Sequence, residues 1–297
     1  ARLSRHAGRH IISTPLEHSS VSGTLTALQE QGYEIDLLDV KQDGTVDLEH
    51  LKDLLRPDTI CVAVTLVDSE LGVVQPVQEI AAILKAYPHC HLHVDATQAV
   101  GKIPVSFEGV DTMSLTAHKF YGLNGIGLLI KRRNLALDGL RHLVVTGALQ
   151  AGDKLPSVRA LASSLACALD LAVTDLPGRV DHVAKLNAEL RAALSTYPLV
   201  RINSPDHAIP HVLNLSVRNV KGTVFQRELD AKGVCVSVKS ACSSDGLPSR
   251  AVFAVSRDRR NALSSWRISL SHLTTEDEIK AFLQAFDVCY RELTAVH

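Results

Sequence analysis

Strand-like and helix-like patterns alternate along the first half of the chain. Residues 59–67 form a continuous β-branched and apolar run, which is typical of a strand buried on both faces. Residues 18–32 and 77–88 instead space their apolar positions as an amphipathic helix does. The same two patterns predict strands at 10–16, 33–40, 91–96 and 125–131 and a helix at 47–55. This alternation predicts an α/β protein with a mostly parallel sheet, whose site lies beyond the carboxyl ends of the strands.

From about Leu155 the pattern becomes helical. Residues 157–176 and 179–197 carry amphipathic stripes, and Pro177-Gly178 between them indicates a passage into a smaller unit. Further segments predict strands at 211–217, 234–238 and 264–271 and a closing helix at 275–293. We therefore expect a large domain over residues 1–178 and a smaller C-terminal α+β domain over residues 179–297.

Composition and charge narrow the possible partners. The 297 residues are 46% hydrophobic and 21% charged, which is ordinary for a globular protein. A formal net charge of -1 provides no global field that would attract nucleic acid or an anionic membrane. No run approaches the about 18 apolar residues of a membrane span, and the first residues lack the apolar segment of a secretion signal. We expect a cytoplasmic protein that recognises its partners locally, without direct contact to nucleic acid or membrane.

Cysteine and histidine patterns give little support for a metal site. No CxxC pair occurs, so we expect most cysteines to be buried thiols rather than disulfides or metal ligands. The six cysteines are Cys61, Cys90, Cys167, Cys235, Cys242 and Cys289. His89, His91 and His93 alternate and would share one face of a strand, which suits chelation. The segment fits better as a buried strand ending at Asp95, and no metal site is predicted.

Two residues near strand ends carry candidate chemistry. Asp95 ends one predicted strand, and Lys119 lies 24 residues later, just before another. A carboxylate can hold a pyridinium nitrogen protonated, and a lysine amine can condense with an aldehyde. Together they fit pyridoxal phosphate. The competing interpretation is that Lys119 is a solvated loop residue, because lysine side chains are mostly exposed. The spacing from Asp95 alone is weak evidence, because any α/β chain offers such a pair by chance.

Several motifs in a fixed order make the pattern specific. Residues 93–133 resemble the cofactor segment of the NifS/IscS-type cysteine desulfurases, which belong to the class V aminotransferase group of fold-type I pyridoxal-phosphate enzymes. Four other segments resemble the family in the same order along the chain. EHSSV (17–21) resembles its histidine segment, and ELGVVQPV (70–77) resembles its Asn-Asn-Glu segment. SACSS (240–244) resembles its mobile cysteine loop, and WRISLSHLTTEDEI (266–279) resembles its arginine strand. The resemblance spans nearly the whole chain and implies a fold-type I transferase fold.

The resemblance implies a role for each residue at the cofactor. Lys119 would condense with the cofactor aldehyde and then move the α proton of the substrate. Asp95 would pair with the pyridine nitrogen, and Gln98 with the phenolic oxygen. Thr116 and His118 would bind the phosphate from the turn before Lys119.

The resemblance also implies residues that act on L-cysteine. His18 would stack on the cofactor ring and exchange protons with the substrate, against the alternative of a histidine that only caps a helix. Arg267 would bind the substrate carboxylate, against the alternative of a surface arginine. Cys242, with Lys239 nearby to favour the thiolate, would attack the substrate sulfur and keep it as a persulfide while alanine leaves.

The sequence departs from the family pattern in places that concern the cofactor. The Asn-Asn-Glu motif is replaced by Asp68-Ser69-Glu70, which puts Ser69 where an asparagine usually approaches the phenolic oxygen. The Gly-rich loop is reduced to residues 144–154, with Asp153 in place of a threonine, and an acid there would repel phosphate. The sequence contains neither the family's Asn-Ala-Ala opening nor its Gly-Ala-Thr turn.

The leading hypothesis from sequence is a homodimeric cysteine desulfurase. It would pass persulfide sulfur to an acceptor protein that serves iron–sulfur clusters, thiolated tRNA or DNA phosphorothioate. One alternative is a selenocysteine lyase, which shares these motifs, including RNAL at 260–263. The other alternative is a non-catalytic pseudo-enzyme of the same fold, which the departures at the cofactor favour.

Overall fold

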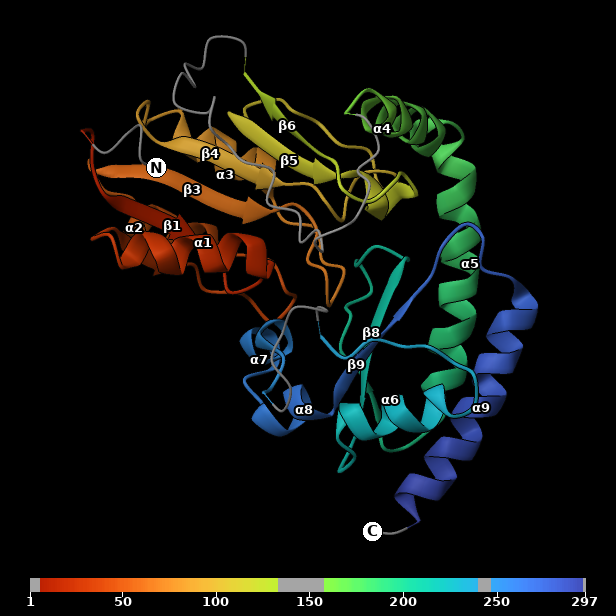
Figure 1. The fold of residues 1–297 in the computed structure, drawn as a ribbon. Coiled ribbons are helices and arrows are strands. Elements are labelled where there is room, and N and C mark those ends of the chain that lie inside the picture. Colours follow the sequence, from red (N-terminus) through yellow and green to blue (C-terminus); the bar gives the residue numbers. More distant parts are fainter. Residues whose placement is uncertain (1–5, 133–157, 240–246, 296–297) are drawn as a thin grey trace, which may run out of the picture.

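The computed structural model describes residues 6–132, 158–239 and 247–295, and a six-stranded sheet forms the upper layer of Figure 1. The strands follow the order β2-β1-β3-β4-β5-β6. Their bounds are β1 (His10–Ser13), β2 (Glu34–Leu37), β3 (Thr59–Thr65), β4 (His91–Asp95), β5 (Thr112–Thr116) and β6 (Gly127–Lys131). All neighbours pair in parallel except β5 and β6, which are antiparallel. The prediction of a mostly parallel sheet is confirmed.

Helices cover both faces of this sheet. They are α1 (Ser19–Gln29), α2 (Leu48–Leu54), α3 (Val77–Leu84) and the 3-10 turn η2 (Ala117–Phe120). Adjacent residues of a strand point to opposite faces. On β1, Ile11 packs in one buried cluster with Leu25 of α1, whereas Ile12 packs in another with Leu51 of α2 and Ile80 of α3. The apolar spacing along each helix is therefore explained by the face that it buries.

A second, three-stranded sheet has its own core. Its strands, in the antiparallel order β7-β8-β9, are β7 (Val200–Ile202), β8 (Val212–Val217) and β9 (Ser265–Ser269). The helices that follow β6 along the chain are α4 (Val158–Val173), α5 (Leu176–Leu194), α6 (Gly222–Asp230), α7 (Arg250–Ser256), α8 (Arg259–Ser264) and α9 (Glu276–Thr294). Trp266 stacks on Phe225 at 5.1 Å between ring centroids, and Phe286 lies 5.2 Å from Phe225. Figure 1 shows α5 and α9 side by side along this sheet.

The two cores meet at the break between α4 and α5. Leu165 of α4 belongs to the core of the large sheet, whereas Val183 of α5 belongs to the core of the small one. Asp175 adopts a left-handed conformation with φ 51° between the helices, and Pro177 lies in the first turn of α5, where a missing backbone N–H costs nothing. The boundary expected at residue 178 falls in the first turn of α5 and stays a prediction.

One predicted strand is wrong, and two observed strands were not predicted. Residues 234–238 do not form a strand, because only Ser237 pairs with β9, in a single bridge to Arg267. Val234, Val236 and Val238 pack against the core of the small sheet. Their burial explains why apolar residues alternate in this segment although it forms no strand. The polar strand β5 and the three-residue strand β7 were not predicted, because neither has a strong apolar pattern.

One helix pair has membrane-like composition. Within the described ranges, no single helix is long and apolar enough to cross a membrane. Residues 159–173 and 176–194 together reach that length and composition, but they are bent by 69° at their junction.

Candidate active site

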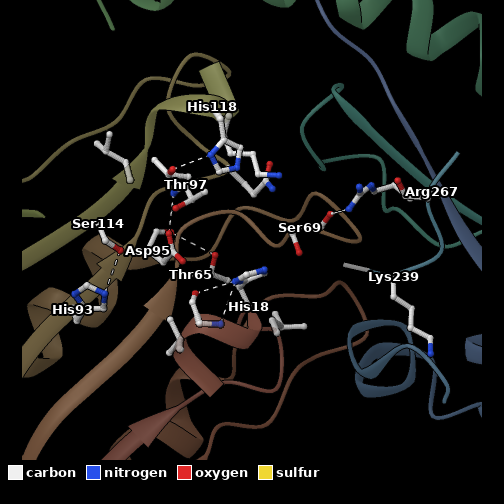
Figure 2. A pocket seen from close by; sticks show the side chains of 18 of the residues that line it. His18, Thr65, Ser69, His93, Asp95, Thr97, Ser114, His118, Lys239 and Arg267 are labelled. Atoms are coloured by element: carbon white, nitrogen blue, oxygen red, sulfur yellow. Dashed lines mark hydrogen bonds between the residues drawn. The ribbon is translucent and has the colours of Figure 1, made fainter. Parts of the chain in front are cut away.

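A cavity of about 840 Å³ opens where the ends of the central parallel strands face β9 (Figure 2). The predicted site residues that line it are His18, Asp95, Gln98, Thr116, His118, Lys119 and Arg267. Cys242, the remaining predicted residue, lies outside the described residues. In Figure 2, Asp95, Thr97 and His118 lie across the cavity from Arg267 and Lys239. Residues distant in sequence are thus brought into one site.

Parallel strands place the centre of the site. Thr65, Asp95 and Thr116 are the last residues of β3, β4 and β5, which are neighbours in the sheet. Thr65 pairs with Asp95 in the ladder, and Asp95 pairs with Ser114. The carboxyl ends of these strands therefore meet at one edge, where the side chains that follow them converge.

Asp95 has one carboxylate oxygen held by the protein. Its Oδ1 accepts a hydrogen bond from the backbone N–H of Thr97 at 2.9 Å, and the side chain is 8% exposed. The turn after β4 thereby fixes the carboxylate at the cavity wall. Its other oxygen is left to accept a proton donor of a ligand, as a pyridinium N–H would be.

The turn after β5 presents Thr116, His118 and Lys119. The Thr116 hydroxyl lies 3.0 Å from His118 Nδ1, so Nε2 is the ring nitrogen left for a ligand. Burial lowers the pKa of His118, and the charge of Lys119 lowers it further. The 3-10 turn η2 is followed by Tyr121 in a left-handed conformation with φ 69°, and His118 and Lys119 are exposed in this turn.

His18 serves as a helix cap and also lines the cavity. Its Nδ1 accepts a hydrogen bond from the Ser20 backbone N–H at 3.2 Å, which caps the start of α1. In the neutral ring the proton is then on Nε2. The capping alternative is thus observed, and it holds the ring at the cavity wall rather than excluding a role there.

Arg267 reaches the cavity from the small sheet. Its Nη1 donates to the Ser69 carbonyl oxygen at 2.6 Å, and its Nε donates to the Ser269 hydroxyl at 3.1 Å. These two bonds fix the guanidinium plane and leave Nη2 for a ligand. Burial lowers the pKa of Arg267 while the charges of Glu70 and Asp68 raise it. Arg267 is therefore a positioned cation rather than a free surface arginine.

The ionisable lining favours an anionic ligand. Among the described residues, Lys119, Lys239 and Arg267 line the cavity, against the single carboxylate of Asp95. Cations in a partly enclosed cavity attract anions more strongly than they do on an open surface. This charge balance suits a molecule that carries phosphate or carboxylate groups.

Two buried acids lie behind this wall. Glu17 accepts hydrogen bonds at Oε1 from the Thr65 backbone N–H at 2.7 Å and the Thr14 hydroxyl at 2.8 Å, whereas no described residue bonds its Oε2. Burial is the main reason that the pKa of Glu17 is raised to about 8. The two hydrogen bonds lower this pKa, whereas the nearby charges of Asp95 and Asp68 raise it. At neutral pH Glu17 is therefore mostly protonated and adds little negative charge to the site.

Asp68 is the second buried acid, and it stands where the resembled family has asparagine. Its Oδ2 accepts hydrogen bonds from the backbone N–H groups of Glu70 and Leu71, and no described residue bonds its Oδ1. Burial, followed by the charge of Glu70, raises the pKa of Asp68 to about 7. A neutral amide would satisfy the same turn without a charge to desolvate.

None of the five cysteines in the described part of the chain lines the cavity. Cys90 and Cys289 are buried and Cys61 is partly buried, whereas Cys167 and Cys235 are exposed, so the expectation of mostly buried thiols holds only in part. Burial raises the pKa of Cys61 to about 11 and that of Cys90 to about 12. Both thiols are therefore protonated and unreactive near neutral pH.

The alternating histidines of β4 are hydrogen-bonded within the sheet. His91 Nε2 lies 2.7 Å and His93 Nδ1 lies 2.9 Å from the hydroxyl of Thr112 on β5. Among the residues that the structure describes, no group of three His, Cys, Asp or Glu side chains is arranged to hold a metal ion. Burial lowers the pKa of His91 to about 4 and also lowers that of His93.

Sequence reasoning missed several lining residues. They are uncharged residues at strand ends and on α6, including Thr65, Thr97, Ser114 and Gln226. Such residues are common in loops, so their type alone carries no signal. Two of them could have been identified by position: Thr97 comes two residues after Asp95, and Thr65 lies near the end of the strand predicted at 59–67.

Comparison with known proteins agrees with this arrangement. Residues 1–282 match the family model described as Aminotransferase class-V. A protein named Cysteine desulfurase IscS from Dictyoglomus turgidum is 32% identical over 97% of this chain and 74% of its own length. A probable mitochondrial cysteine desulfurase from Schizosaccharomyces pombe is 34% identical over 94% of this chain and 56% of its own length.

Solved structures show the same likeness. A NifS-like protein superposes with a TM-score of 0.85 at 31% identity, covering 99% of this chain and 78% of its own. DndA from Streptomyces lividans superposes with a TM-score of 0.70 at 30% identity, covering 90% of this chain and 76% of its own. The expected fold-type I architecture is thereby confirmed.

Asp68→Asn should stabilise the chain at high pH. The pKa of Asp68 is raised from 3.8 to about 7 in the folded chain, so its contribution to stability is greatest below pH 4 and is lost as pH rises to about 7. We expect the free energy of unfolding at pH 8 to rise by about 2 kcal/mol, with the gain fading towards pH 4. Denaturant unfolding at both pH values measures this. The matched control Asp53→Asn, on the exposed side of α2, should shift it by less than about 0.5 kcal/mol. A gain of equal size at pH 4 and pH 8 would contradict the assignment.

Proposed function

The chain belongs to the class V aminotransferase family, and on that basis we propose that it is a pyridoxal-phosphate-dependent cysteine desulfurase. The observation that carries the proposal is the convergence of Lys119, Asp95, His18 and Arg267 on one cavity. The relatives named cysteine desulfurase, about 30–34% identical over nearly the whole chain, support it.

The donor set of the cavity fits pyridoxal phosphate group by group. Lys119 offers an amine for the aldehyde, and Asp95 offers a carboxylate oxygen for the ring nitrogen. Gln98 offers an amide for the phenolic oxygen, while Thr116 and His118 offer a hydroxyl and an imidazole for the phosphate. The three cations of the lining balance the negative charge that the cofactor brings. We therefore propose these five residues as its binding site, with His18 on the ring face.

The side chains of this chain can then process L-cysteine. When bound, the cofactor supplies an electron sink conjugated with the α-carbon of the substrate. Arg267 holds the substrate carboxylate through its remaining N–H groups, which fixes the α-carbon relative to Lys119. Lys119 removes the α proton, and His18 is placed to return a proton to the substrate.

Sulfur transfer requires a nucleophile, which we assign to Cys242. Its thiolate attacks the substrate sulfur, so an S–S bond forms as the Cβ–S bond breaks and the carbon fragment leaves as alanine after protonation. Lys239 lines the cavity three residues before Cys242, and three residues of chain span at most about 11 Å. None of the other five cysteines, all within the described part of the chain, lines the cavity.

No structural observation favours the selenocysteine lyase alternative. The RNAL segment lies in α8, where Asn261 is buried and donates to the Asn203 side chain at 2.9 Å, and none of its four residues lines the cavity. The segment supports the small sheet instead of selecting a substrate. The pseudo-enzyme alternative is opposed by the retention of Lys119, Asp95 and Arg267 in one site.

We propose a homodimer that passes its sulfur to an acceptor protein. Relatives named cysteine desulfurase support the release of sulfur from cysteine, and we propose iron–sulfur clusters as its destination. Exposed apolar side chains on α4 and on the segment from η2 to β6 support a covered surface; they are Tyr121, Leu123, Leu128, Leu129, Leu171 and Val173. The Leu123 N–H donates to Ser164 on α4, which joins the two parts of this surface.

Lys119→Ala should abolish the visible absorption of cofactor-loaded protein and reduce alanine formation from cysteine at least about 1000-fold, because no other amine among the described lining residues is placed beside Asp95 and Thr116. Absorption spectra before and after borohydride, together with alanine release, measure this. Lys85→Ala, at the exposed end of α3, is the control and should behave as wild type. Alanine release by Lys119→Ala at the wild-type rate would refute the assignment.

Cys242→Ser should keep the cofactor spectrum and still bind cysteine, because Lys119 and Arg267 are unchanged. Persulfide formation should fall at least about 100-fold, since a hydroxyl without an adjacent base is a poor nucleophile near neutral pH. Mass spectrometry of cysteine-treated wild type should locate one labile sulfur on the peptide containing Cys242. The exposed Cys235→Ser is the matched control. A label on Cys61 or Cys289 would rule out the proposed route.

Sedimentation velocity at micromolar concentration should give about twice the 32.1 kDa mass of the chain. Leu123→Glu places a charge on the exposed apolar surface and should shift the population towards monomer. Val288→Glu, at an equally accessible site on α9, should leave the mass unchanged. A fully active wild-type monomer would refute the dimer.

A further inference from the structure

Lys102 lies behind the cavity wall in the turn that follows β4. It comes four residues after Gln98, and its side chain is partly buried. Its Nζ donates a hydrogen bond to Gln98 Oε1 at 2.7 Å. Gln98 lines the cavity whereas Lys102 does not. A hydrogen-bonding effect of Lys102 on a ligand at this wall therefore passes through Gln98, whereas its charge can also act through space.

The Lys102 bond determines which end of the Gln98 amide is presented to a ligand. An ammonium group can only donate, so the oxygen of the amide must be the end that contacts Lys102. The NH2 end is then left for the cavity, where it can donate but not accept. Without Lys102 the amide could rotate and present its oxygen instead.

The surroundings of Lys102 also favour an anion nearby. The charges of Lys119 and Arg267 act on Lys102, and the buried imidazole of His211 also faces it. None of the described carboxylates lies within salt-bridge distance of its Nζ. Burial, together with the charge of Lys119 and Arg267, lowers the pKa of Lys102 to about 8. Burying a cation without a counter-charge is costly, and a ligand anion would offset this cost.

We propose that Lys102 is a positioning residue, which holds the Gln98 amide with its NH2 towards the phenolic oxygen of pyridoxal phosphate and so selects the cofactor with that oxygen ionised. The inference rests on the proposed function, because it concerns the same cofactor. A rotated amide would place two acceptor oxygens against each other and favour the protonated form. Lys102 thus sets the protonation state of the cofactor without touching it.

The test follows the pH dependence of the visible absorption band of the cofactor-loaded chain. In Lys102→Met, the midpoint should move up by about one pH unit, and the cofactor should bind about tenfold more weakly. Lys102→Arg, which keeps a charged donor, should restore most of both effects. Lys85→Met applies the same substitution at an exposed site and should match wild type. If Lys102→Met does not fold, Lys102→Gln removes the charge with a similar side-chain length.

A double-mutant cycle distinguishes positioning from a general charge effect. In a Gln98→Ala background, Lys102→Met should move the midpoint by less than about a third of its effect in wild type. The same shift in both backgrounds, or no shift in the wild-type background, would overturn the inference while leaving the proposed function intact. A wild-type chain without any borohydride-sensitive band would instead refute the proposed function, and the inference with it.

Discussion

Thr65, Asp95 and Ser114 stand next to one another in the ladder of β3, β4 and β5, because these strands run parallel and in a single register. Every residue of the turns that follow is positioned from this edge. The turn after β4 presents Asp95 and Gln98, and the turn after β5 presents Lys119. A slip of one residue in the register would move each side chain to the other face of the sheet and separate the group.

The small sheet completes the site through a few polar contacts. Arg267 of β9 donates to the Ser69 carbonyl oxygen, and its own backbone exchanges hydrogen bonds of 3.1 and 2.7 Å with Ser237. These contacts hold the Arg267 guanidinium opposite Asp95 and also fix the segment that ends at Lys239. The relative position of the two sheets thus decides the width of the cavity in which chemistry can occur.

Burial adjusts the charges around this cavity. Glu17 and Asp68 lie behind the wall with raised pKa values, so they contribute less negative charge than two ordinary carboxylates would. Lys102 lies behind the same wall with a lowered pKa, but it remains mostly protonated at pH 7. The balance favours anionic ligands, and it depends on groups that do not line the cavity.

The pattern of residues along the chain was enough to predict the alternation of strands and helices, the α/β class, and the residue types that line the cavity. Asp95, Lys119 and Arg267 were recognisable because their motifs follow one another in a specific order along the chain. The folded structure was needed to show that residues 234–238 pack without forming a strand, that β5 lies beside β4, and that Lys102 donates a hydrogen bond to Gln98. The physical reason is that local patterns record which face of a segment is buried, whereas strand pairing, desolvation and hydrogen-bond partners depend on segments far apart in the chain.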